Sequence, residues 1–480
     1  MSEQVSPVQS KKREQFSSRI GFILAAAGSA VGIGNLVGFP VNAAKNGGAA
    51  FLLIYAIFIV AICLPVMIAE MSLGRSTRSN PIGAYKKAAG SNAWKIAGWF
   101  AVITPFMIAV FYQVLTVWLL AYLIGALTGN LAAMAEPDYF GAFINSNGVF
   151  AYLIVLTLLL GCILNFGVQQ GIERLSKTLM PVLIVMLVVL TVFVLTLPNA
   201  WLGVKYYLIP DLTKISPQAI NSALGHAFFS LSLGMGIMIT YGSYMQRNQS
   251  IASNAKAVAL VDTLVAFMAG LLILPAIFVF DSSTNTTDLS SSSVSLVFTF
   301  LPKIFLSMQD NIGYLGASIF ATVFFLQVFI AALTSQVSIL QVPLAAFKDQ
   351  LGFSRKKSVL WLGACAALLV LASTVSFGMV EFFSSFISYA GSTKSFFDLI
   401  VDVFYETILP LNGLIICLFV SKRWKKHNLE NECKEGDDAY ANSFTKKYVD
   451  VALTTFVPVI LFFVFLNTVA IKFFNFNVFG

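Results

Sequence analysis

Residues 18–40 read SRIGFILAAAGSAVGIGNLVGFP, an apolar run that glycines interrupt at Gly28, Gly32 and Gly34. In hydrocarbon every backbone N–H and C=O needs a partner, so a broken helix is tolerated only around a cavity or a bound ligand. Such a break exposes carbonyls that can coordinate a cation and N–H groups that can hold a carboxylate. Gly28 and Gly32 also fit the small-xxx-small spacing of plain helix packing, which is the simpler interpretation of this run taken alone.

The composition extends a membrane interpretation to the whole chain of 480 residues. Hydrophobic residues make up 58% of the chain and charged residues 11%, whereas soluble domains carry about 25% charged residues. A soluble protein of this length would expose most of its apolar surface to water, which excludes the soluble classes. Two histidines and five cysteines without a CxxC pair give no basis for a haem, a metal centre or a disulfide framework. We therefore expect an all-α polytopic membrane protein.

Apolar runs of about 20 residues, long enough to cross a bilayer, recur along the sequence. They predict eleven transmembrane helices, which begin near Ile20, Gly48, Ile96, Val149, Ile172, Gln218, Ala255, Ile312, Val359, Phe396 and Val449. Two irregular stretches, 131–147 and 282–310, are long and expected outside the cell. Residues 295–308 within the second read as an amphipathic helix at the membrane surface.

The basic residues set the expected orientation. Most of the 30 lysines and arginines fall in alternate connecting segments, among them 11–19, 75–95, 348–357 and 422–447. Because cytoplasmic loops carry the excess of such residues, the N-terminus is expected inside and, after eleven spans, the C-terminus outside. The scatter of these residues at the ends of apolar runs argues against a nucleic-acid partner for the net charge of +8. The N-terminal residues stay polar for too long to form a cleaved signal peptide.

A second glycine-interrupted run lies in the expected sixth helix, where residues 230–236 read SLSLGMG. Paired interruptions in the first and sixth helices favour a binding site between two inverted repeats of five helices. A membrane enzyme is not expected, because no set of nucleophile, base and orienting group emerges from the sequence.

Several separate motifs, in order along the chain, resemble those of the neurotransmitter:sodium symporter family. They are residues 18–40, NGGAAF at 46–51, PVMIAEMSLGR at 65–75, GIERLSKTLMP at 171–181, FFSLSLGMGIMITYGSY at 228–244 and AALTSQVSILQVP at 331–343. The resemblance spans residues 13 to about 424 and includes the bacterial amino-acid transporters of that family. It implies a 5+5 inverted-repeat fold with broken helices 1 and 6.

The resemblance also implies a division of the chain. The parts are a cytoplasmic N-terminal segment 1–19, a transporter core 20–422, a cytoplasmic loop 423–447, and helix 11 with a short extracellular C-terminus at 448–480.

Two sodium sites and no chloride site are implied by the same resemblance. The first would use Ala30, Asn35, Ser230 and Asp262, and the second the carbonyls of Gly28, Val31 and Ala331 with the hydroxyls of Thr334 and Ser335. All of these ligands are oxygens, which suits a hard cation. Thr334 and Ser335 could instead bond the backbone four residues back, as such hydroxyls often do in membrane helices.

Asp262 carries more information than any other single residue. An ionised Asp at the centre of a span costs about 2.5–3.5 kcal/mol on insertion scales, so it needs a partner unless it is protonated or lies near water. Many animal relatives have Asn at this position and need chloride to balance two sodium ions. The fixed carboxylate therefore implies chloride independence, and Ala266, at the family's chloride-binding position, agrees with that expectation.

The resemblance places a substrate pocket around the first break. Tyr112 and the N–H groups of Ile33 and Gly34 would meet a substrate carboxylate, and Gly32 stands where amine transporters of the family carry an Asp. A glycine there favours an amino acid, which brings its own carboxylate. The side-chain subsite would comprise Ile108, Phe229, Ser232, Met235 and Ile339, with Ala30, Ser230 and Ser335 shared with the sodium sites. That mostly apolar set suits a neutral, apolar or aromatic side chain.

A cytoplasmic latch is implied by four residues that match the family's inner gate, namely Arg13, Asp349, Tyr244 and Gln341. Two further polar residues fall inside apolar runs. Glu70 is expected to bond the broken sixth helix, and His226 is expected to be a satisfied polar core residue rather than a proton relay.

The outer gate departs from the family pattern. Asp402 matches the gate carboxylate, but Gly38 occupies the position of its arginine partner. Three interpretations stay open: another cation such as Lys394 replaces the arginine, the gate closes by aromatic packing alone, or the space admits a larger or cationic substrate that pairs with Asp402.

The sequence thus predicts a sodium-coupled importer of neutral amino acids, working by alternating access in the plasma membrane. The alternatives are a sodium symporter for a cationic or amine-like solute and a non-transporting nutrient sensor on the same scaffold. The expected partners are the amino acid, sodium ions and the lipid bilayer, and the sequence does not decide between a monomer and a dimer.

Overall fold

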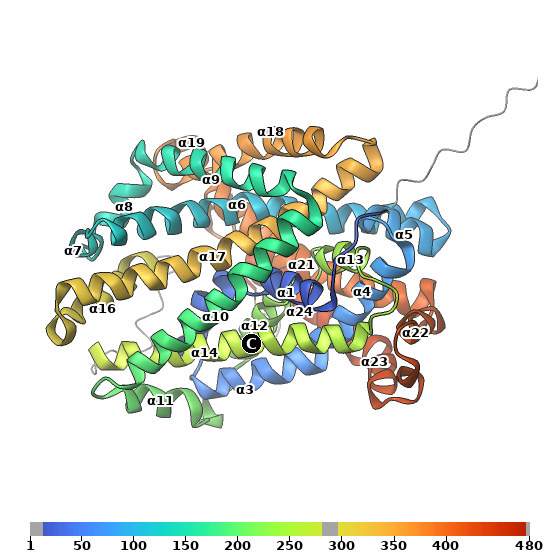
Figure 1. The fold of residues 1–480 in the computed structure, drawn as a ribbon, viewed down its shortest axis with the longest axis horizontal. Coiled ribbons are helices and arrows are strands. Elements are labelled where there is room, and N and C mark those ends of the chain that lie inside the picture. Colours follow the sequence, from blue (N-terminus) through green and yellow to red (C-terminus); the bar gives the residue numbers. More distant parts are fainter. Residues whose placement is uncertain (1–12, 281–295, 477–480) are drawn as a thin grey trace, which may run out of the picture.

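The computed structural model describes residues 13–280 and 296–476. Residues 1–12 of the expected N-terminal segment, 281–295 of the expected outer loop and the last four residues of the expected extracellular C-terminus lie outside the described part. The described chain is almost entirely helical, with one short hairpin (Figure 1).

Long apolar helices, continuous or in two pieces, form the body of the molecule. They are α1 (Arg19–Ala30) with α2 (Phe39–Lys45), α3 (Ala49–Phe58) with α4 (Leu64–Thr77), α6 (Lys95–Leu127), α9 (Gly148–Asn165), α10 (Arg174–Leu195), α12 (Pro217–Ser230) with α13 (Ile237–Gly242), α14 (Ile251–Phe280), α17 (Gln309–Leu351), α18 (Arg355–Thr374), α20 (Phe396–Ile400) with α21 (Leu409–Leu418), and α23 (Phe444–Thr454) with α24 (Phe456–Phe474). Wider π-helical turns complete several of them, at Gly34–Gly38, Ile59–Cys63, Val168–Glu173, Val401–Ile408 and Phe419–Trp424.

Short elements cap the two ends of the bundle. They are α5 (Pro81–Ala89), α7 (Leu131–Met134), α8 (Tyr139–Ile144), α11 (Ala200–Leu208), α16 (Leu301–Ser307), α19 (Glu381–Ser384), α22 (Lys426–Lys434), and the hairpin of β1 (Ile387–Tyr389) and β2 (Ser392–Lys394). In Figure 1, α7, α8, α11 and α16 lie at the left end, which we call the α16 face. Helices α5 and α22 lie at the right end, which we call the Arg13 face.

The described residues contain nine helices long and apolar enough to span a membrane, and a bent pair, α1 and the Gly34–Lys45 segment, makes ten. The expected sixth span is present as α12 and α13, two pieces separated by residues 231–236 and each too short to cross alone. The prediction of an all-α polytopic fold with broken helices 1 and 6 is confirmed, and the count of eleven is consistent with these segments.

Both broken spans lie near the middle of the bundle along its long axis, as Figure 1 shows for α1 and α12. The first break bends its span by 53°. The second passes through left-handed backbone at Ser232, Gly234 and Gly236. Such conformations are readily adopted by glycine but cost energy at a serine, so the surrounding contacts must hold Ser232 in place.

Polar side chains satisfy the freed backbone of the second break. A Glu70 carboxylate oxygen accepts a hydrogen bond from the Gly234 N–H at 2.8 Å. The Asn412 amide donates to the Gly234 carbonyl, also at 2.8 Å. Glu70 therefore bonds the broken sixth helix, as its position in an apolar run suggested.

The segment expected to form a surface helix is packed into the bundle instead. Phe298 is buried, and its ring lies 5.7 Å from Trp118 and 5.1 Å from Phe140, centroid to centroid. The Tyr122 hydroxyl donates to the Phe298 carbonyl at 2.8 Å. An apolar pattern on one side of a short helix fits a lipid surface and a protein groove equally well, which is why the sequence did not separate the two.

Glycines let α4 and α13 touch backbone to backbone. A Cβ added at Gly74 would lie 1.9 Å from the Ile239 carbonyl oxygen, and one added at Gly242 would lie 2.4 Å from the Met71 carbonyl oxygen. Small residues at helix contacts serve this purpose in membranes, where close packing rather than apolar burial drives association.

We therefore expect Gly74→Ala to destabilise the protein, because the new methyl group must displace backbone rather than a flexible side chain. Overpacking of this kind typically costs about 1–3 kcal/mol. The measurement is the apparent melting temperature of the purified protein in detergent. Gly161→Ala is the matched control, since a Cβ there meets nothing within 4 Å; equal melting temperatures for the two variants would contradict the packing argument.

Candidate functional site

A cavity of about 500 Å³ lies beside the first break and within the range of small-molecule sites. Tyr112 and Phe229 stand in its wall together with Ile33 and Gly34 of the predicted substrate residues. Most of the remaining wall is apolar or aromatic, and its charged side chains are Asp398, Glu406 and Lys472.

The break in α1 places a phenol against backbone N–H. The Ile33 N–H donates to the Tyr112 hydroxyl oxygen at 3.2 Å. A Cβ at Gly32 would lie 2.7 Å from the Tyr112 hydroxyl oxygen and 2.8 Å from the Ser335 hydroxyl oxygen. The site therefore has no room for a side chain at position 32 in this arrangement. The Tyr112 hydroxyl, which accepts from the Ile33 N–H, keeps its own proton and can donate it to a carboxylate.

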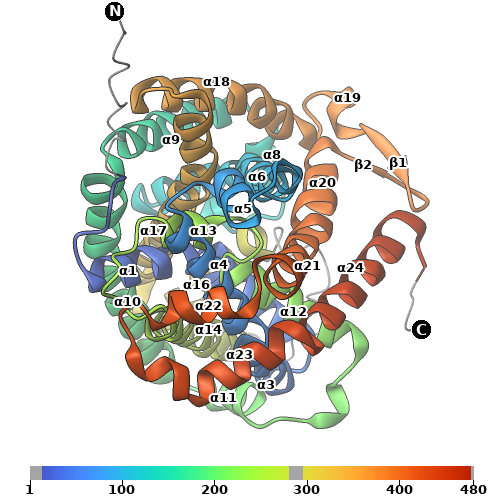
Figure 2. The same cartoon turned by 90° about the vertical axis from the view of Figure 1, so that its right-hand side faces the viewer.

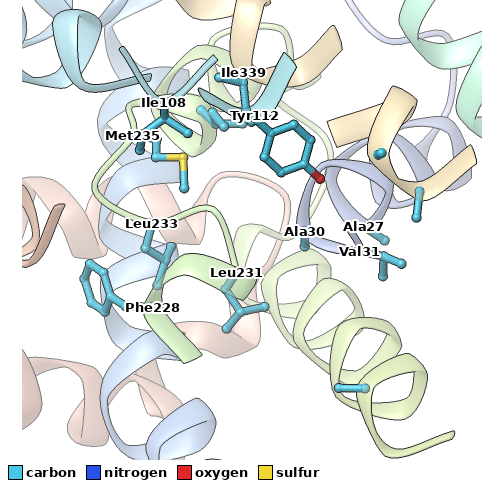
Figure 3. Packing of buried hydrophobic residues seen from close by; sticks show 14 of the residues in the cluster. Ala27, Ala30, Val31, Ile108, Tyr112, Phe228, Leu231, Leu233, Met235 and Ile339 are labelled. Atoms are coloured by element: carbon cyan, nitrogen blue, oxygen red, sulfur yellow. The ribbon is translucent and has the colours of Figure 1, made fainter. Parts of the chain in front are cut away.

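Three predicted subsite residues lie in the packed core near Tyr112 and not in the cavity wall. Ile108, Met235 and Ile339 are buried, and Figure 3 shows them gathered near the Tyr112 ring while its hydroxyl points toward the helix that carries Ala30. None of the three is part of the cavity wall described above. Phe229, in contrast, lines the cavity, with its ring 4.6 Å from that of Tyr405. The hydroxyl of the buried Ser232 donates to the Ser29 carbonyl at 3.1 Å.

The residues predicted for the first sodium site form one buried cluster. Asp262, which is 0% exposed, accepts hydrogen bonds from the Asn35 amide at 2.7 Å and from the Ser230 hydroxyl at 2.9 Å. The Asn35 amide oxygen accepts a hydrogen bond from the Gly32 N–H at 3.1 Å. Asp262 thus has partners in the protein, as an Asp inside a span requires. Ala30, the fourth predicted ligand, is buried in the last turn of α1.

Around Ser335, the structure brings several oxygens of the second predicted site together. The Ser335 hydroxyl lies 3.0 Å from the Val31 and Ser29 carbonyl oxygens and 3.4 Å from that of Gly28. A hydroxyl has one proton, so it can donate to only one of these carbonyls at a time. The remaining oxygens form a set suited to a hard cation.

Thr334 behaves differently from its neighbour. Its hydroxyl lies 3.1 Å from the Ile330 carbonyl, four residues back, and 3.0 Å from the Ala331 carbonyl. The Thr334 hydroxyl therefore bonds the backbone of its own helix in this arrangement. One of the two carbonyls that it contacts, that of Ala331, is itself a predicted sodium ligand. Ser335 is the hydroxyl that crosses to α1.

On the Arg13 face the predicted latch residues are in contact. Arg13 pairs with Asp349 at 2.6 Å, and its guanidinium lies 4.9 Å from the centre of the Tyr244 ring. The Gln341 amide donates to the Tyr244 hydroxyl at 2.9 Å. Asp349 also accepts hydrogen bonds from the backbone and side-chain nitrogens of Asn80 at 3.1 and 3.0 Å. The pair is therefore one part of a network that joins the N-terminal segment, α5 and α17.

Glu14 forms a second set of polar contacts between the N-terminal segment and the helices. Its carboxylate pairs with Lys348 at 2.7 Å and Arg355 at 3.4 Å, and accepts from the Val168 N–H at 3.0 Å. Burial alone would raise the pKa of Glu14, but these cations and hydrogen bonds hold the pKa below its ordinary value. Because the folded-state pKa is the lower one, this contribution to stability is present above the ordinary Glu pKa and is lost as the pH falls.

Asp402, the carboxylate expected at the outer gate, has two cations beside it. The sequence left open whether another cation such as Lys394 replaces the arginine missing at position 38, and in the structure Asp402 pairs with Lys394 at 3.8 Å and with Lys472 at 3.1 Å. The interpretation in which another cation replaces the arginine is the one that agrees with these contacts. Lys472 was missed because it lies on the last helix, 70 residues from Asp402.

Tyr55 and His226 complete the surroundings of the breaks. The Tyr55 hydroxyl lies 3.2 Å from the Asp262 carboxylate. The sequence did not predict this contact, because Tyr55 lies in the apolar second run without any distinguishing pattern. His226 is buried and in the cavity wall, and a Cβ at Gly38 would lie 3.2 Å from its Cε1. The prediction that His226 is fully satisfied was wrong, because its Nε2 has no hydrogen-bond partner among the described residues.

Three comparisons place this geometry among known proteins. The sequence profile described as the Sodium:neurotransmitter symporter family matches residues 13–140 and 138–477. The chain is 34% identical to the sodium-dependent transporter YhdH of Bacillus subtilis over 96% of this chain and 99% of that one. It is 26% identical to the sodium- and chloride-dependent GABA transporter 2 of Bos taurus over 79% of this chain and 70% of that one. The crystal structure of MhsT in complex with L-phenylalanine matches 95% of this chain and 99% of that one, with 36% identity and a TM-score of 0.83.

The contacts of Arg13 lead to a prediction about how fast a polar reagent reaches the interior of the protein from the Arg13 face. In a background where the exposed Cys162 and Cys365 are replaced by alanine, a cysteine introduced at the buried Ser338 should react slowly with a polar maleimide. Arg13→Ala should raise that labelling rate roughly five- to tenfold, because removal of one partner shifts a near-balanced equilibrium between closed and open states.

The matched control is Lys434→Ala, which breaks an ion pair with Glu430 confined to α22. Its labelling rate should equal that of the parent. The same acceleration in both variants would show that loss of any ion pair on the Arg13 face loosens the protein, and the latch role would be wrong.

Proposed function

Because the chain belongs to the sodium:neurotransmitter symporter family, we propose that it is a sodium-coupled importer of neutral, apolar or aromatic amino acids. The observation that carries the proposal is the environment of Gly32. No side chain fits at that position against Tyr112 and Ser335, so position 32 cannot carry a carboxylate for an amine, and the Tyr112 hydroxyl beside it is a donor for an anionic group. An amino acid supplies that carboxylate itself.

The wall of the cavity supports the apolar part of the proposal. Phe229, Tyr405 and Phe111 surround the space beside Tyr112, and aromatic faces favour an apolar or aromatic substrate side chain. Ile108, Met235 and Ile339 lie buried near the Tyr112 ring (Figure 3) and would form the remaining apolar part of the subsite. The related MhsT binds L-phenylalanine in its crystal structure, which supports the same class of substrate here.

Two sodium ions fit the proposal on charge and ligand type. One would lie among Asn35, Ser230 and Asp262, and the other among the oxygens around Ser335. The carboxylate of Asp262 would balance part of the added positive charge. Ala266 is buried on α14 and has neither charge nor hydroxyl, so chloride would have no ligand at that position. We therefore propose that transport does not require chloride, unlike the chloride-dependent relative from Bos taurus.

Alternating access would use the two ends of the bundle as gates. We propose that the Arg13 face is cytoplasmic and that the α16 face points outward, so the described arrangement is closed inside by the Arg13–Asp349 network. Each positive charge that moves inward gains about 2.3 kcal/mol per 100 mV of membrane potential. Two sodium ions moving with a zwitterion would thus be driven by voltage as well as by the sodium gradient.

The alternative of a cationic or amine-like substrate loses its main support. It rested on an unpaired Asp402, whereas Asp402 has Lys394 and Lys472 beside it and accepts a hydrogen bond from Tyr389 at 2.7 Å. A non-transporting sensor on the same scaffold would bind the amino acid without accumulating it.

The proposal is tested by uptake of radiolabelled amino acids into proteoliposomes under an inward sodium gradient. We expect phenylalanine and other neutral apolar amino acids to accumulate, and accumulation to stop when potassium replaces sodium on both sides. Binding of phenylalanine without accumulation would favour the sensor, and sodium-driven uptake of amines alone would overturn the assignment of the substrate.

Asp262 gives a sharper prediction on the ion. Asp262→Asn keeps the shape and one acceptor oxygen but removes the charge and the second acceptor, so we expect the sodium concentration for half-maximal uptake to rise at least about tenfold, which corresponds to about 1.4 kcal/mol. Replacing chloride by gluconate should leave the uptake of the parent protein unchanged.

Ser318→Ala is the control for Asp262→Asn, since Ser318 is buried in α17 and its hydroxyl oxygen has no partner among the described residues. This variant should keep the parent's sodium dependence. If Asp262→Asn has the sodium dependence of the parent, Asp262 is not a sodium ligand. If uptake by the parent protein is lost in gluconate, transport requires chloride and the proposal of chloride independence is wrong.

A further inference from the structure

Four charged side chains gather where the last helix meets the wall of the cavity, and we call them the Lys472 cluster: Asp402, Glu406, Lys394 and Lys472. Asp402 and Glu406 lie on the π-helical turn Val401–Ile408 between α20 and α21. Lys394 ends β2, and Lys472 lies in the last turn of α24. Two carboxylates and two ammonium groups make the cluster neutral as a whole.

Lys472 holds the central place in the cluster. Its ammonium lies 2.6 Å from Glu406 and 3.1 Å from Asp402, whereas Lys394 reaches Asp402 alone, at 3.8 Å. Asp402 is almost fully buried at 6% exposure, so it depends on these partners more than a surface carboxylate does. Lys472 is therefore the cation that joins both carboxylates.

The last helix is held in place beside the cluster by a separate contact. The rings of Phe473 and Tyr389 lie 5.2 Å apart, and the Tyr389 hydroxyl donates to Asp402 at 2.7 Å. In Figure 2, α24 and the β1–β2 hairpin run next to each other at the edge of the bundle. The position of Lys472 is thus fixed by packing as well as by charge.

The two lysines differ in what they face. Lys472 and Glu406 line the cavity, and Lys394 and Asp402 are not part of its wall. Within the described residues, Lys472 is the sole Lys or Arg among those that line this cavity. The first broken helix contributes no cation here, because position 38 is a glycine facing His226.

We propose that Lys472 determines the charge selectivity of the transporter: by neutralising Glu406 at the cavity wall and Asp402 behind it, Lys472 excludes cationic amino acids and amines. This inference rests on the proposed function and adds the residue that restricts it to neutral substrates. The last helix then takes part in the outer gate, a role that the first helix would fill if it carried an arginine at position 38.

The physical reason is the charge that remains when Lys472 is removed. Glu406 would then face the cavity without its partner, and Asp402 would keep only the longer contact to Lys394. Glu406 is 30% exposed, and an unpaired, partly buried carboxylate in a cavity raises the local concentration of cations. The ammonium group of a lysine substrate would supply that missing charge.

The test measures how L-lysine inhibits sodium-driven uptake of L-phenylalanine in proteoliposomes. The parent protein should be insensitive to lysine. In Lys472→Met, a side chain of similar length without the charge, the inhibition constant for lysine should fall at least about tenfold below that of the parent, and labelled lysine should itself be taken up. Lys472→Arg should behave as the parent.

Two matched variants separate this effect from a general loss of positive charge. Lys394→Met removes a cation from the same cluster that does not line the cavity, and it should leave lysine excluded. Lys472→Met combined with Glu406→Gln removes both members of the pair, and exclusion of lysine should return. A double-mutant cycle over Lys472 and Glu406 gives their coupling.

The outcomes are distinguishable from those that test the proposed function. If the parent accumulates phenylalanine and Lys472→Met excludes lysine as the parent does, the inference on Lys472 is wrong while the transport proposal stands. If Lys394→Met admits lysine as readily as Lys472→Met does, the exclusion of lysine does not depend on a cation in the cavity wall, and the inference on Lys472 is wrong. Should Lys472→Met fail to fold, Lys472→Gln and the double variant carry the same comparison.

Discussion

The whole site depends on one constraint, that backbone groups freed inside a membrane must find partners within the protein. The second break is held by Glu70 on the Gly234 N–H and by Asn412 on the Gly234 carbonyl. The first is held by Tyr112 and Asn35, which bond the N–H groups of Ile33 and Gly32. These contacts keep the backbone of the breaks in fixed positions, so that the carbonyl oxygens around Ser335 lie together where a sodium ion can use them.

The scarcity of charge follows from the same constraint. Each charged group inside the bundle has a specific neighbour: Asp262 has Asn35 and Ser230, and Lys472 has Glu406. The two ends of the bundle are organised differently. On the Arg13 face the ion pairs of Arg13 and Glu14 join the N-terminal segment to the helices, whereas the four charges of the Lys472 cluster join the last helix to the turn Val401–Ile408 and to β2. The contacts on the Arg13 face can be broken by moving one short segment, while the Lys472 cluster requires the last helix to move or its charges to be replaced.

Much of the fold and part of the site could be predicted from the sequence. The paired glycine breaks and the need of Asp262 and Glu70 for polar partners follow from what apolar runs tolerate; which groups those partners are depends on which helices touch. Thr334 and Ser335 show the limit: both carry a hydroxyl in the same turn, but only Ser335 faces α1, because adjacent residues on a helix point about 100° apart.

Lys472 shows a second limit, of another kind. A lysine in the last turn of a final helix is expected on topology alone to lie at the membrane surface, and no spacing in the sequence connects it to Asp402. Its role follows only when the helices are assembled, since α24 packs against the π-helical turn that carries both carboxylates. On the proposal for Lys472, the glycine at position 38 does not mean a missing gate. A different helix would supply the cation, and the last described span, which stands outside the two inverted repeats, would then influence the selectivity of the site between them.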